Sequence, residues 1–185
     1  MSRYPLEATP FDHAIRAWIM ARQNADTHRF FDIVSTVGGV APMQWAGILL
    51  AIWLWSRGRR RAAFGVVVSP LLAMLTYSGV RQVITRDRPP GAAGLREATS
   101  SFPSAHSTTA AAVCCTVAYI LWRERMLSTP VAILLAVIPP LVIGVSRLYL
   151  DVHWMTDVFA GWTAGVVIAA IAGALYRRVS PTRWQ

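Results

Sequence analysis

The sequence is poor in charge, has no lysine and contains only two cysteines in 185 residues. Charged residues make up 15% of the chain, whereas a soluble domain has about 25%, so the composition argues against a water-soluble domain. Cys114 and Cys115 are neighbours, so they do not suit ordinary disulfide geometry and lack the spacing of zinc ligands. We interpret both as small apolar packing residues.

In place of charge the chain has long apolar runs. Five segments of 17 to 23 residues contain no Asp, Glu, Arg or Lys. At about 1.5 Å per helical residue, each is long enough to cross a hydrocarbon layer of about 30 Å, the fourth only barely. The sequence therefore predicts an all-α, polytopic membrane helical bundle, with one membrane domain over residues 33–176. The predicted spans are 33–55, 62–80, 102–122, 129–145 and 158–176.

Residues 1–32 are polar and contain no long apolar run, so no signal peptide is expected. The segment Thr9-Pro10-Phe11-Asp12 is typical of a helix cap with proline at the first helical position. We expect an interfacial amphipathic helix on the membrane surface, with an ordinary helix packed on the bundle as the alternative. If it inserts, the spans number six. Its apolar face would consist of Phe11, Ile15, Trp18 and Ile19.

Five spans make the connecting loops alternate between two faces. The RGRRR loop (57–61), the loop 123–126 and a cytoplasmic tail, 177–185, fall on one face. The N-terminal region and the loops 81–101 and 146–157 fall on the other. Each face carries nine arginines, but eight of the nine acidic residues lie on the second face. Several arginines there have a binding role argued below, so the positive-inside rule places RGRRR in the cytoplasm and the second face outside.

The net charge of +9 raises the question of a nucleic-acid partner. The arginines, however, are scattered between membrane spans and do not form one basic stripe. Anionic membrane lipids and an anionic substrate are therefore the expected partners, and no nucleic acid is expected.

The second face places charge beside apolar spans, where charge is expensive and usually functional. Arg81 and Arg88 are seven residues apart, so a helix continuing past the second span would present both on one side. Arg147 adds a third guanidinium. These groups stay charged and match phosphate oxygens with a planar fork. We interpret the neighbouring Arg86 and Asp87 as a local solvated pair.

The segment Pro103-Ser104-Ala105-His106 lies at the beginning of the third span. If Pro103 starts the helix, the N–H groups of Ser104, Ala105 and His106 have no helical partner and point outward. Together with the helix dipole, these N–H groups form a cradle for an anion.

The stretch SRLYLDVHWMTD, residues 146–157, leads into the fifth span. His153 and Asp157 are spaced i and i+4, so one helix face holds both. Asp157 can hydrogen-bond one ring nitrogen and leave the other free to attack. His106 is a second titratable group, suited to protonating a leaving oxygen. Asp151 is given no chemical role.

Each of these residues also has a more ordinary interpretation when taken alone. An arginine at a span end is usually an interfacial anchor, and a histidine at a helix start is usually a hydrogen-bonded structural residue. His106, His153 and Asp157 also form the two-histidine, one-carboxylate set of non-haem iron sites. Three converging arginines favour an oxyanion over a divalent cation, so phosphate chemistry without a metal or other cofactor is the preferred hypothesis.

Taken together, the three clusters resemble the signature of the type 2 phosphatidic acid phosphatase superfamily. R-x6-RP at 81–89, PSAH at 103–106 and SR-x5-H-x3-D at 146–157 correspond in order and spacing to that family's K-x6-RP, PSGH and SR-x5-H-x3-D. Two positions depart from the pattern. Arg81 stands where the family has lysine, and Ala105 replaces a glycine that would tolerate a left-handed backbone better.

The resemblance implies a role for each residue. His153 would be the nucleophile that forms a phosphohistidine, Asp157 would orient it, and His106 would protonate the leaving group and then activate water. No metal or other cofactor is implied. The phosphate would be held by Arg81, Arg88, Ser104, the backbone N–H of Ala105, and Arg147.

The resemblance covers residues 30–176 and implies an integral membrane lipid phosphatase at the external face of a bacterial inner membrane. The layout is closest to short undecaprenyl-diphosphate phosphatases, so undecaprenyl diphosphate is the first expected substrate. Phosphatidylglycerophosphate, phosphatidate and lipid A phosphates are the alternatives. A vanadium haloperoxidase shares the anion-binding signature but is soluble and larger. A small membrane transporter would explain the charge but not the nucleophile.

Overall fold

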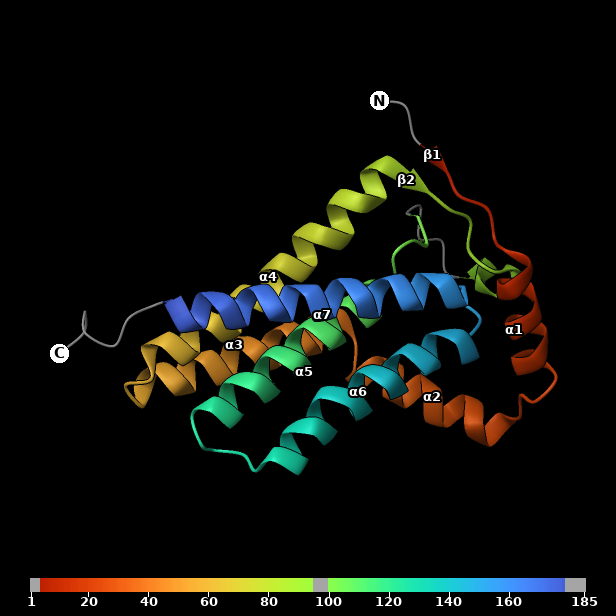
Figure 1. Cartoon of the computed structure of the whole chain (residues 1–185). Coiled ribbons are helices and arrows are strands. Elements are labelled where there is room, and N and C mark those ends of the chain that lie inside the picture. Colours follow the sequence, from red (N-terminus) through yellow and green to blue (C-terminus); the bar gives the residue numbers. More distant parts are fainter. Residues whose placement is uncertain (1–3, 95–99, 179–185) are drawn as a thin grey trace.

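The computed structural model describes residues 4–94 and 100–178, so the expected tail lies outside the described residues from position 179 onward. Apart from loops, this part of the chain is helical, with one 3-10 turn and a short parallel ladder of two strands (Figure 1). The elements in chain order are β1 (Tyr4–Pro5), α1 (Pro10–Met20), α2 (Ala25–Val37), α3 (Val40–Ser56), α4 (Arg60–Val83), β2 (Ile84–Thr85), η1 (Pro90–Gly94), α5 (Ala105–Arg123), α6 (Thr129–Tyr149) and α7 (Met155–Arg178).

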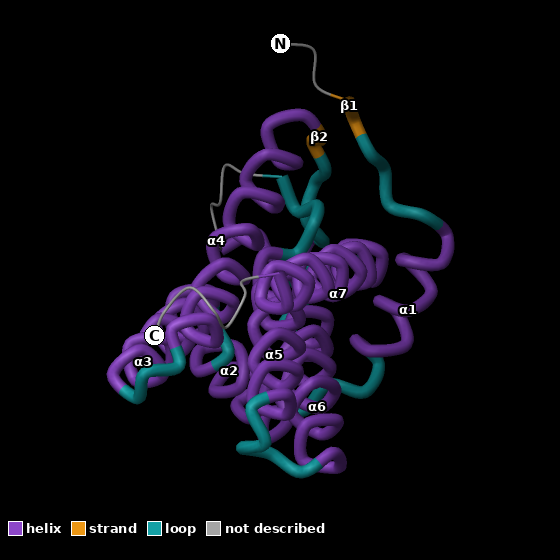
Figure 2. Tube along the Cα trace, turned by 60° about the vertical axis from the view of Figure 1, so that its left-hand side comes forward, coloured by secondary structure: helices purple, strands orange, loops and turns teal. Residues whose placement is uncertain are grey.

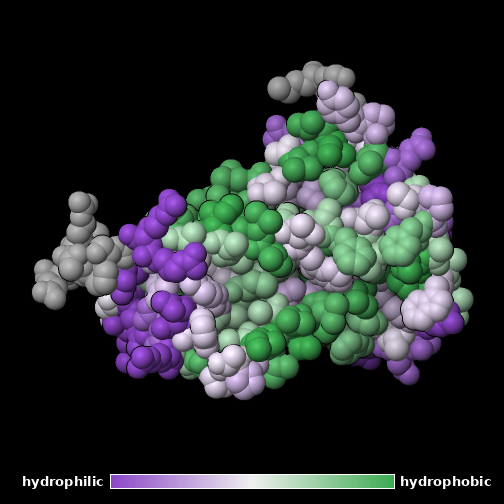
Figure 3. All heavy atoms as spheres, viewed as in Figure 1, coloured by the Kyte–Doolittle hydropathy of each residue, from purple (hydrophilic) through white to green (hydrophobic). Residues whose placement is uncertain are grey.

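The predicted all-α membrane bundle is confirmed. Helices α4, α5, α6 and α7 are each long and apolar enough to cross a bilayer. Helices α2 and α3 are long and apolar enough only as a pair, which is bent by 44°, so the described residues contain four candidate spans, or five if this pair forms one broken span. In Figure 3, hydrophobic residues cover much of the middle of the molecule and hydrophilic residues gather toward its two ends. This distribution suits a protein that spans a membrane.

The first span was expected as one continuous stretch, 33–55, and the structure corrects this prediction. Helix α2 begins earlier, after the N-cap Asn24, and two glycines, Gly38 and Gly39, separate it from α3. Pro42 has no N–H and clashes with a helical carbonyl four residues earlier, so an unbroken helix through these glycines is unfavourable. The chain therefore bends at this point.

Helix α5 is the most buried helix of the bundle and packs closely against α7. A Cβ atom added at Gly161 would lie 2.8 Å from Cβ of Ser107 and 2.9 Å from the carbonyl oxygen of Ser104. Farther along α7, a Cβ atom at Gly165 would lie 2.7 Å from the carbonyl oxygen of Thr108. Small residues allow membrane helices to approach this closely. The approach brings the first turn of α7 against the first turn of α5, where the predicted site residues lie.

The N-terminal helix α1 lies across the ends of α6 and α7 (Figures 1 and 2). It begins as predicted, with proline at the first helical position and a capping box between Thr9 and Asp12. Ile19 is buried in a cluster with residues of α6 and α7, whereas Phe11 and Trp18 are exposed. The helix therefore packs on the bundle, which was the alternative to a purely interfacial helix. Contact of its exposed apolar side chains with the membrane stays a prediction.

At the opposite end of the bundle, the turns between α3 and α4 and between α5 and α6 lie together (Figure 1). Arg59 of the first turn and Glu124 of the second form an ion pair at 2.6 Å. The two loops that the sequence assigned to one face therefore do share a face.

Candidate active site

The three polar clusters predicted from the sequence lie at the same end of the bundle. The segment after β2, the first turn of α5, and the connection between α6 and α7 are joined there by hydrogen bonds. The end of α4 projects away from them (Figure 1) and reaches the site through the side chain of Arg81. Arg81 Nη2 donates to the carbonyl oxygen of Pro103 at 3.1 Å. Arg88 Nη1 donates to the carbonyl oxygen of Val152 at 2.9 Å. Alternation of the spans thus predicted correctly which segments meet.

His153 and Asp157 form the predicted pair. Nδ1 of His153 lies 3.4 Å from Oδ2 of Asp157, and the same oxygen accepts a hydrogen bond from the N–H of Trp154 at 3.0 Å. The pair does not lie on one helix face as expected, because α7 begins only at Met155. His153 lies in the connection before the helix, and Asp157 lies in its first turn. Both residues are buried.

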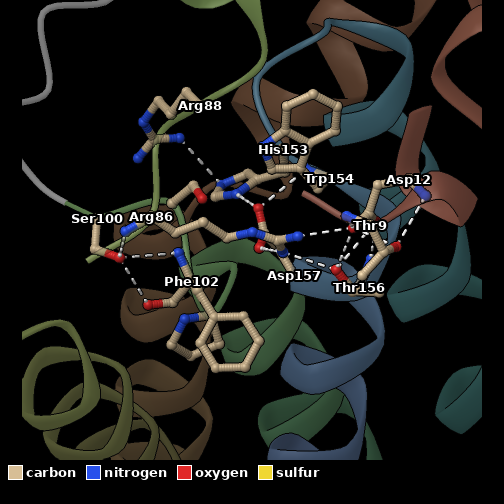
Figure 4. A network of polar contacts seen from close by, with 12 residues as sticks. Thr9, Asp12, Arg86, Arg88, Ser100, Phe102, His153, Trp154, Thr156 and Asp157 are labelled. Carbon is tan, nitrogen blue, oxygen red and sulfur yellow. Dashed lines mark hydrogen bonds and ion pairs between the residues drawn. The ribbon is translucent and has the colours of Figure 1, made fainter. Parts of the chain in front are cut away.

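Arg88 and Asp157 favour the same tautomer of His153. Nη1 of Arg88 lies 3.4 Å from Nε2 of the ring (Figure 4). A guanidinium can only donate, so this contact requires a lone pair on Nε2 and leaves the ring proton on Nδ1, facing Asp157. A neutral imidazole with an unprotonated Nε2 is the form that can attack an electrophile.

Burial keeps His153 in this neutral form. Desolvation of the charged ring lowers the pKa of His153 from 6.5 to about 4. The hydrogen bond and the charge of Asp157 oppose this shift, while Arg88 and Arg147 reinforce it. At neutral pH the ring is therefore uncharged and keeps a lone pair on one nitrogen.

His106 and the three predicted arginines complete the group. All four side chains are partly exposed, in contrast to His153. The hydroxyl of Ser35, in α2, accepts a hydrogen bond from Nη1 of Arg147. Positive charge gathered beside a nucleophilic nitrogen suits the binding of an oxyanion such as phosphate. His106 interacts electrostatically with three guanidinium groups and with a second imidazole ring, which belong to Arg81, Arg88, Arg147 and His153.

The first turn of α5 differs from the expectation. The helix begins at Ala105 and not at Pro103, and Ser104 is its N-cap. The N–H of Ser104 is not directed outward, because it donates to the carbonyl oxygen of Asp157 at 3.1 Å. The N–H groups of Ala105 and His106 lie in the first turn, which α-helical bonding leaves unsatisfied. Ala105 has a right-handed helical backbone, so alanine in place of glycine causes no backbone strain.

Arg81 and Arg88 reach the site by a different route from the one expected. Helix α4 ends at Val83, so the two arginines do not share a helix face. The β-branched pair Ile84-Thr85 continues as β2 and pairs with β1. Beyond it, Pro89 and the proline that follows exclude a helix through Arg88.

Arg86 is the site residue that the sequence analysis missed. Its interpretation as a solvated pair with Asp87 is wrong, because Arg86 is only 5% exposed. Nη1 donates to Oδ1 of Asp157 at 2.5 Å, and Nη2 donates to Oδ2 of Asp12 at 2.7 Å (Figure 4). Its i, i+2 spacing from Arg88 was the available signal, since alternate residues of an extended segment share a face.

Asp151, which was given no chemical role, fastens the connection that carries His153. Its two carboxylate oxygens accept hydrogen bonds from Arg16 of α1, each at 2.7 Å. Oδ2 also accepts from the N–H of Gly91 in η1 at 2.9 Å. The backbone of Asp151 is left-handed, with φ of 53°, a conformation in which aspartate is enriched.

The structure also bears on the alternative of a metal site at His106, His153 and Asp157. Both carboxylate oxygens of Asp157 are already engaged, one by a guanidinium and the other by an N–H. Within residues 4–94 and 100–178, no group of three His, Cys, Asp or Glu side chains is placed to hold a metal ion. The arrangement of charges fits an oxyanion.

Comparisons with known proteins agree with this site. Residues 62–181, more than half of the chain, match the protein family described as the PAP2 superfamily. The chain belongs to the PAP2 superfamily. The matched range contains all three clusters, and the predicted resemblance to the type 2 phosphatidic acid phosphatases is confirmed at the level of the family.

The chain is similar in sequence to a bacterial phosphatase. This PAP2 chain is 34% identical over 92 residues to phosphatidylglycerophosphatase B of Bacillus subtilis (strain 168). The match covers 48% of this chain and 45% of that protein, so it spans less than half of the relative's length. The likeness is to a phosphatidylglycerophosphatase and not to the undecaprenyl-diphosphate phosphatases that the short layout had suggested.

Two solved structures share the PAP2 fold over most of the chain. A transmembrane PAP2-type phosphatidylglycerolphosphate phosphatase from Bacillus subtilis has a TM-score of 0.76 at 22% identity, covering 93% of this chain and 87% of that one. LpxE from Aquifex aeolicus has a TM-score of 0.69 at 20% identity, covering 91% and 98%, respectively. These likenesses confirm the fold as that of a multi-pass membrane protein.

Proposed function

We propose that this protein is an integral membrane lipid phosphatase that cleaves a phosphate from a lipid through a phosphohistidine, without a metal or other cofactor. The observation that carries the proposal is the environment of His153. Its Nε2 lies 3.4 Å from Nη1 of Arg88, a donor that favours an unprotonated Nε2, and its Nδ1 faces Asp157. Arg147 also acts on the ring electrostatically. A nucleophile and the charge that binds its target are thereby present in one place.

In the first step, Nε2 of His153 attacks the phosphorus atom of the bound lipid phosphate. The N–P bond forms while the bond between phosphorus and the lipid oxygen breaks. His106, in its protonated form, donates a proton to the departing oxygen, so the lipid leaves as an alcohol. Asp157 stabilises the positive charge that develops on the ring of His153. Arg81, Arg88, Arg147 and the first turn of α5, at Ser104 and Ala105, hold the phosphoryl oxygens.

In the second step, water displaces the histidine. His106, now neutral, takes a proton from a water molecule whose oxygen attacks the phosphorus atom. The N–P bond breaks, inorganic phosphate leaves, and His153 regains its lone pair. The enzyme returns to its starting state with His106 protonated.

The likenesses favour a glycerophospholipid phosphate as the substrate. The named relative and one of the two solved structures are phosphatidylglycerophosphate phosphatases, so phosphatidylglycerophosphate replaces undecaprenyl diphosphate as the first candidate. Phosphatidate, lipid A phosphates and undecaprenyl diphosphate remain in the panel to be tested. All carry a phosphate at a membrane surface, which suits a site at the end of a bundle.

We infer that the site faces the exterior of a bacterial inner membrane. The support is the charge of the opposite end, where the RGRRR loop and the loop 123–126 lie, because positive loops are retained in the cytoplasm.

The test measures phosphate release from this panel of lipids by purified protein in detergent with excess chelator. We expect release from at least one lipid phosphate, with none by His153→Ala and ordinary rates by His28→Ala, which changes an exposed histidine of α2. Absence of release from every lipid would refute the proposed activity. Full activity of His153→Ala would place the nucleophile elsewhere.

A further inference from the structure

A buried chain of charges connects α1 to the proposed catalytic pair (Figure 4). The guanidinium of Arg86 binds Asp157 through Nη1 at 2.5 Å and Asp12 through Nη2 at 2.7 Å. The side chain of Arg86 is 1% exposed, and both carboxylates are fully buried. Arg86 therefore bridges a carboxylate of α1 and a carboxylate of α7, two helices far apart in the sequence.

Arg86 holds one oxygen of Asp157 so that the other faces His153. Oδ1 is bound by Nη1 of Arg86, while Oδ2 accepts from the N–H of Trp154 and lies 3.4 Å from Nδ1 of His153. The bond at Oδ1 restrains rotation of the carboxylate about its Cβ–Cγ bond. Arg86 therefore fixes the plane of the carboxylate through Oδ1, and this fixes the direction in which Oδ2 points toward His153.

Asp12 in turn fixes Arg86 and balances its charge. Its carboxylate accepts hydrogen bonds from the N–H and hydroxyl groups of Thr9 and Thr156. Burial raises the pKa of Asp12, but these hydrogen bonds outweigh burial and lower it from 3.8 to about 2, so the residue stays ionised. Arg86 and Asp157 alone form a neutral pair, whereas the three groups together carry one negative charge. That charge stabilises the imidazolium that forms during attack.

Attachment of α1 alone does not account for this arrangement. A buried ion pair seldom stabilises a protein more than apolar side chains of similar size, because desolvation offsets the attraction. The helix already has a second ion pair, between Arg16 and Asp151, and packs through the buried Ile19. The bridge at Arg86 is distinguished by its contact with Asp157.

We propose that Asp12 and Arg86 are positioning residues of the phosphatase reaction, which orient Asp157 and preserve its negative charge toward His153. The inference rests on the proposed function, because it concerns the same catalytic pair. It makes α1, which lies outside the range of the family match, a part of the active site.

The kinetic test compares Asp12→Asn with two controls, as purified protein in detergent. With phosphatidylglycerophosphate, kcat of Asp12→Asn should fall about 10- to 100-fold at unchanged KM, by analogy with the loss of a group that orients a metal-ligating histidine. Arg22→Gln changes an exposed arginine just after the same helix, and Arg16→Gln breaks the other ion pair of α1, but neither touches the buried group of Asp12, Arg86 and Asp157. Both should keep most of the wild-type kcat. Equal kcat values for Asp12→Asn and the controls would overturn the proposal.

A second measurement does not depend on turnover. In protein with isotope-labelled histidine, the Nδ1 proton of His153 is identified in NMR spectra by its loss in His153→Ala. It should shift upfield in Asp12→Asn and Arg86→Lys, because its hydrogen bond to Asp157 weakens, and it should stay in place in Arg16→Gln. If the wild type releases no phosphate but the resonance shifts, the proposed function fails and the positioning stands. If the wild type is active and the resonance does not move, only the positioning fails.

Discussion

Replacing Arg86 by methionine tests whether the buried bridge exists. Methionine has a similar apolar stem but no charge, so Arg86→Met leaves the ionised carboxylates of Asp12 and Asp157 buried without their shared cation. The change also removes hydrogen bonds to the hydroxyl of Thr156 and the carbonyl oxygen of Glu7. We expect the folded protein to lose stability because neither carboxylate can reach water.

The size of the loss follows from the burial of all three side chains. Removing one partner of a buried ion pair costs about 3–5 kcal/mol of unfolding free energy. For a chain of about this length, each kcal/mol lowers the melting temperature by about 2–4 °C, so the expected decrease is about 6–20 °C. Arg86→Lys keeps the charge but not the planar fork, and its melting temperature should lie between those of Arg86→Met and the wild type.

The assay is thermal unfolding of purified protein in detergent, followed by tryptophan fluorescence. Arg29→Met, on the exposed surface of α2, is the matched control and should change the unfolding free energy by less than about 0.5 kcal/mol. A melting temperature of Arg86→Met equal to that of Arg29→Met would refute the argument. It would mean that Arg86 is solvated, as its sequence neighbourhood suggested.

Four further expectations concern the reaction. Phosphate release should persist in excess chelator, and loss of turnover reversed by a divalent cation would contradict the proposed chemistry. Arg88→Ala should nearly abolish kcat, whereas Arg81→Lys keeps the charge and should lower kcat only slightly. A larger loss of kcat in Arg81→Lys than in Arg88→Ala would contradict the proposed phosphate-binding site. Asp157→Asn should lower kcat by up to about 10⁴-fold, by analogy with the Ser-His-Asp template. Asp151→Asn should keep most activity but melt at a lower temperature than the wild type. If Asp151→Asn and Asp157→Asn lost similar amounts of kcat, the assignment of Asp157 as the partner of His153 would be contradicted. Burial lowers the pKa of His153 from 6.5 to about 4, so its neutral form persists as the pH falls. The decline of kcat/KM due to this ring should therefore occur near pH 4, and a midpoint near 6.5 would contradict it.

Much of the fold could be predicted because it depends on local composition. Apolar runs long enough to span a bilayer identify α4 to α7, and the cap at Thr9 identifies the start of α1. The break at Gly38 and Gly39 was missed because the count of charged residues does not register backbone preference. The expected helix through Arg81 and Arg88 was too long for a related reason. Helix α4 ends at Val83, and the β-branched residues and prolines that follow disfavour a helix.

The candidate site could be predicted to the extent that its parts follow one another in the chain. Spacing within each motif and the alternation of spans were enough to place His106, His153, Asp157 and the arginines at one end. The backbone conformation and hydrogen bonds of these segments were harder to predict. Ser104 was expected to direct its N–H outward, but close packing of α5 on α7 places the carbonyl oxygen of Asp157 against it.

The sequence by itself determined the all-α membrane architecture, the end of the bundle at which the polar clusters meet, and the two residues of the proposed catalytic pair. Only the tertiary structure decided that Arg86 is buried between Asp12 and Asp157, which lie 74 and 71 positions away in the chain. The physical reason is that the sequence pattern around a charged residue does not identify the residue with which it pairs. Whether an arginine is solvated or paired depends on which distant carboxylates the folded chain brings to it and on whether water is excluded there.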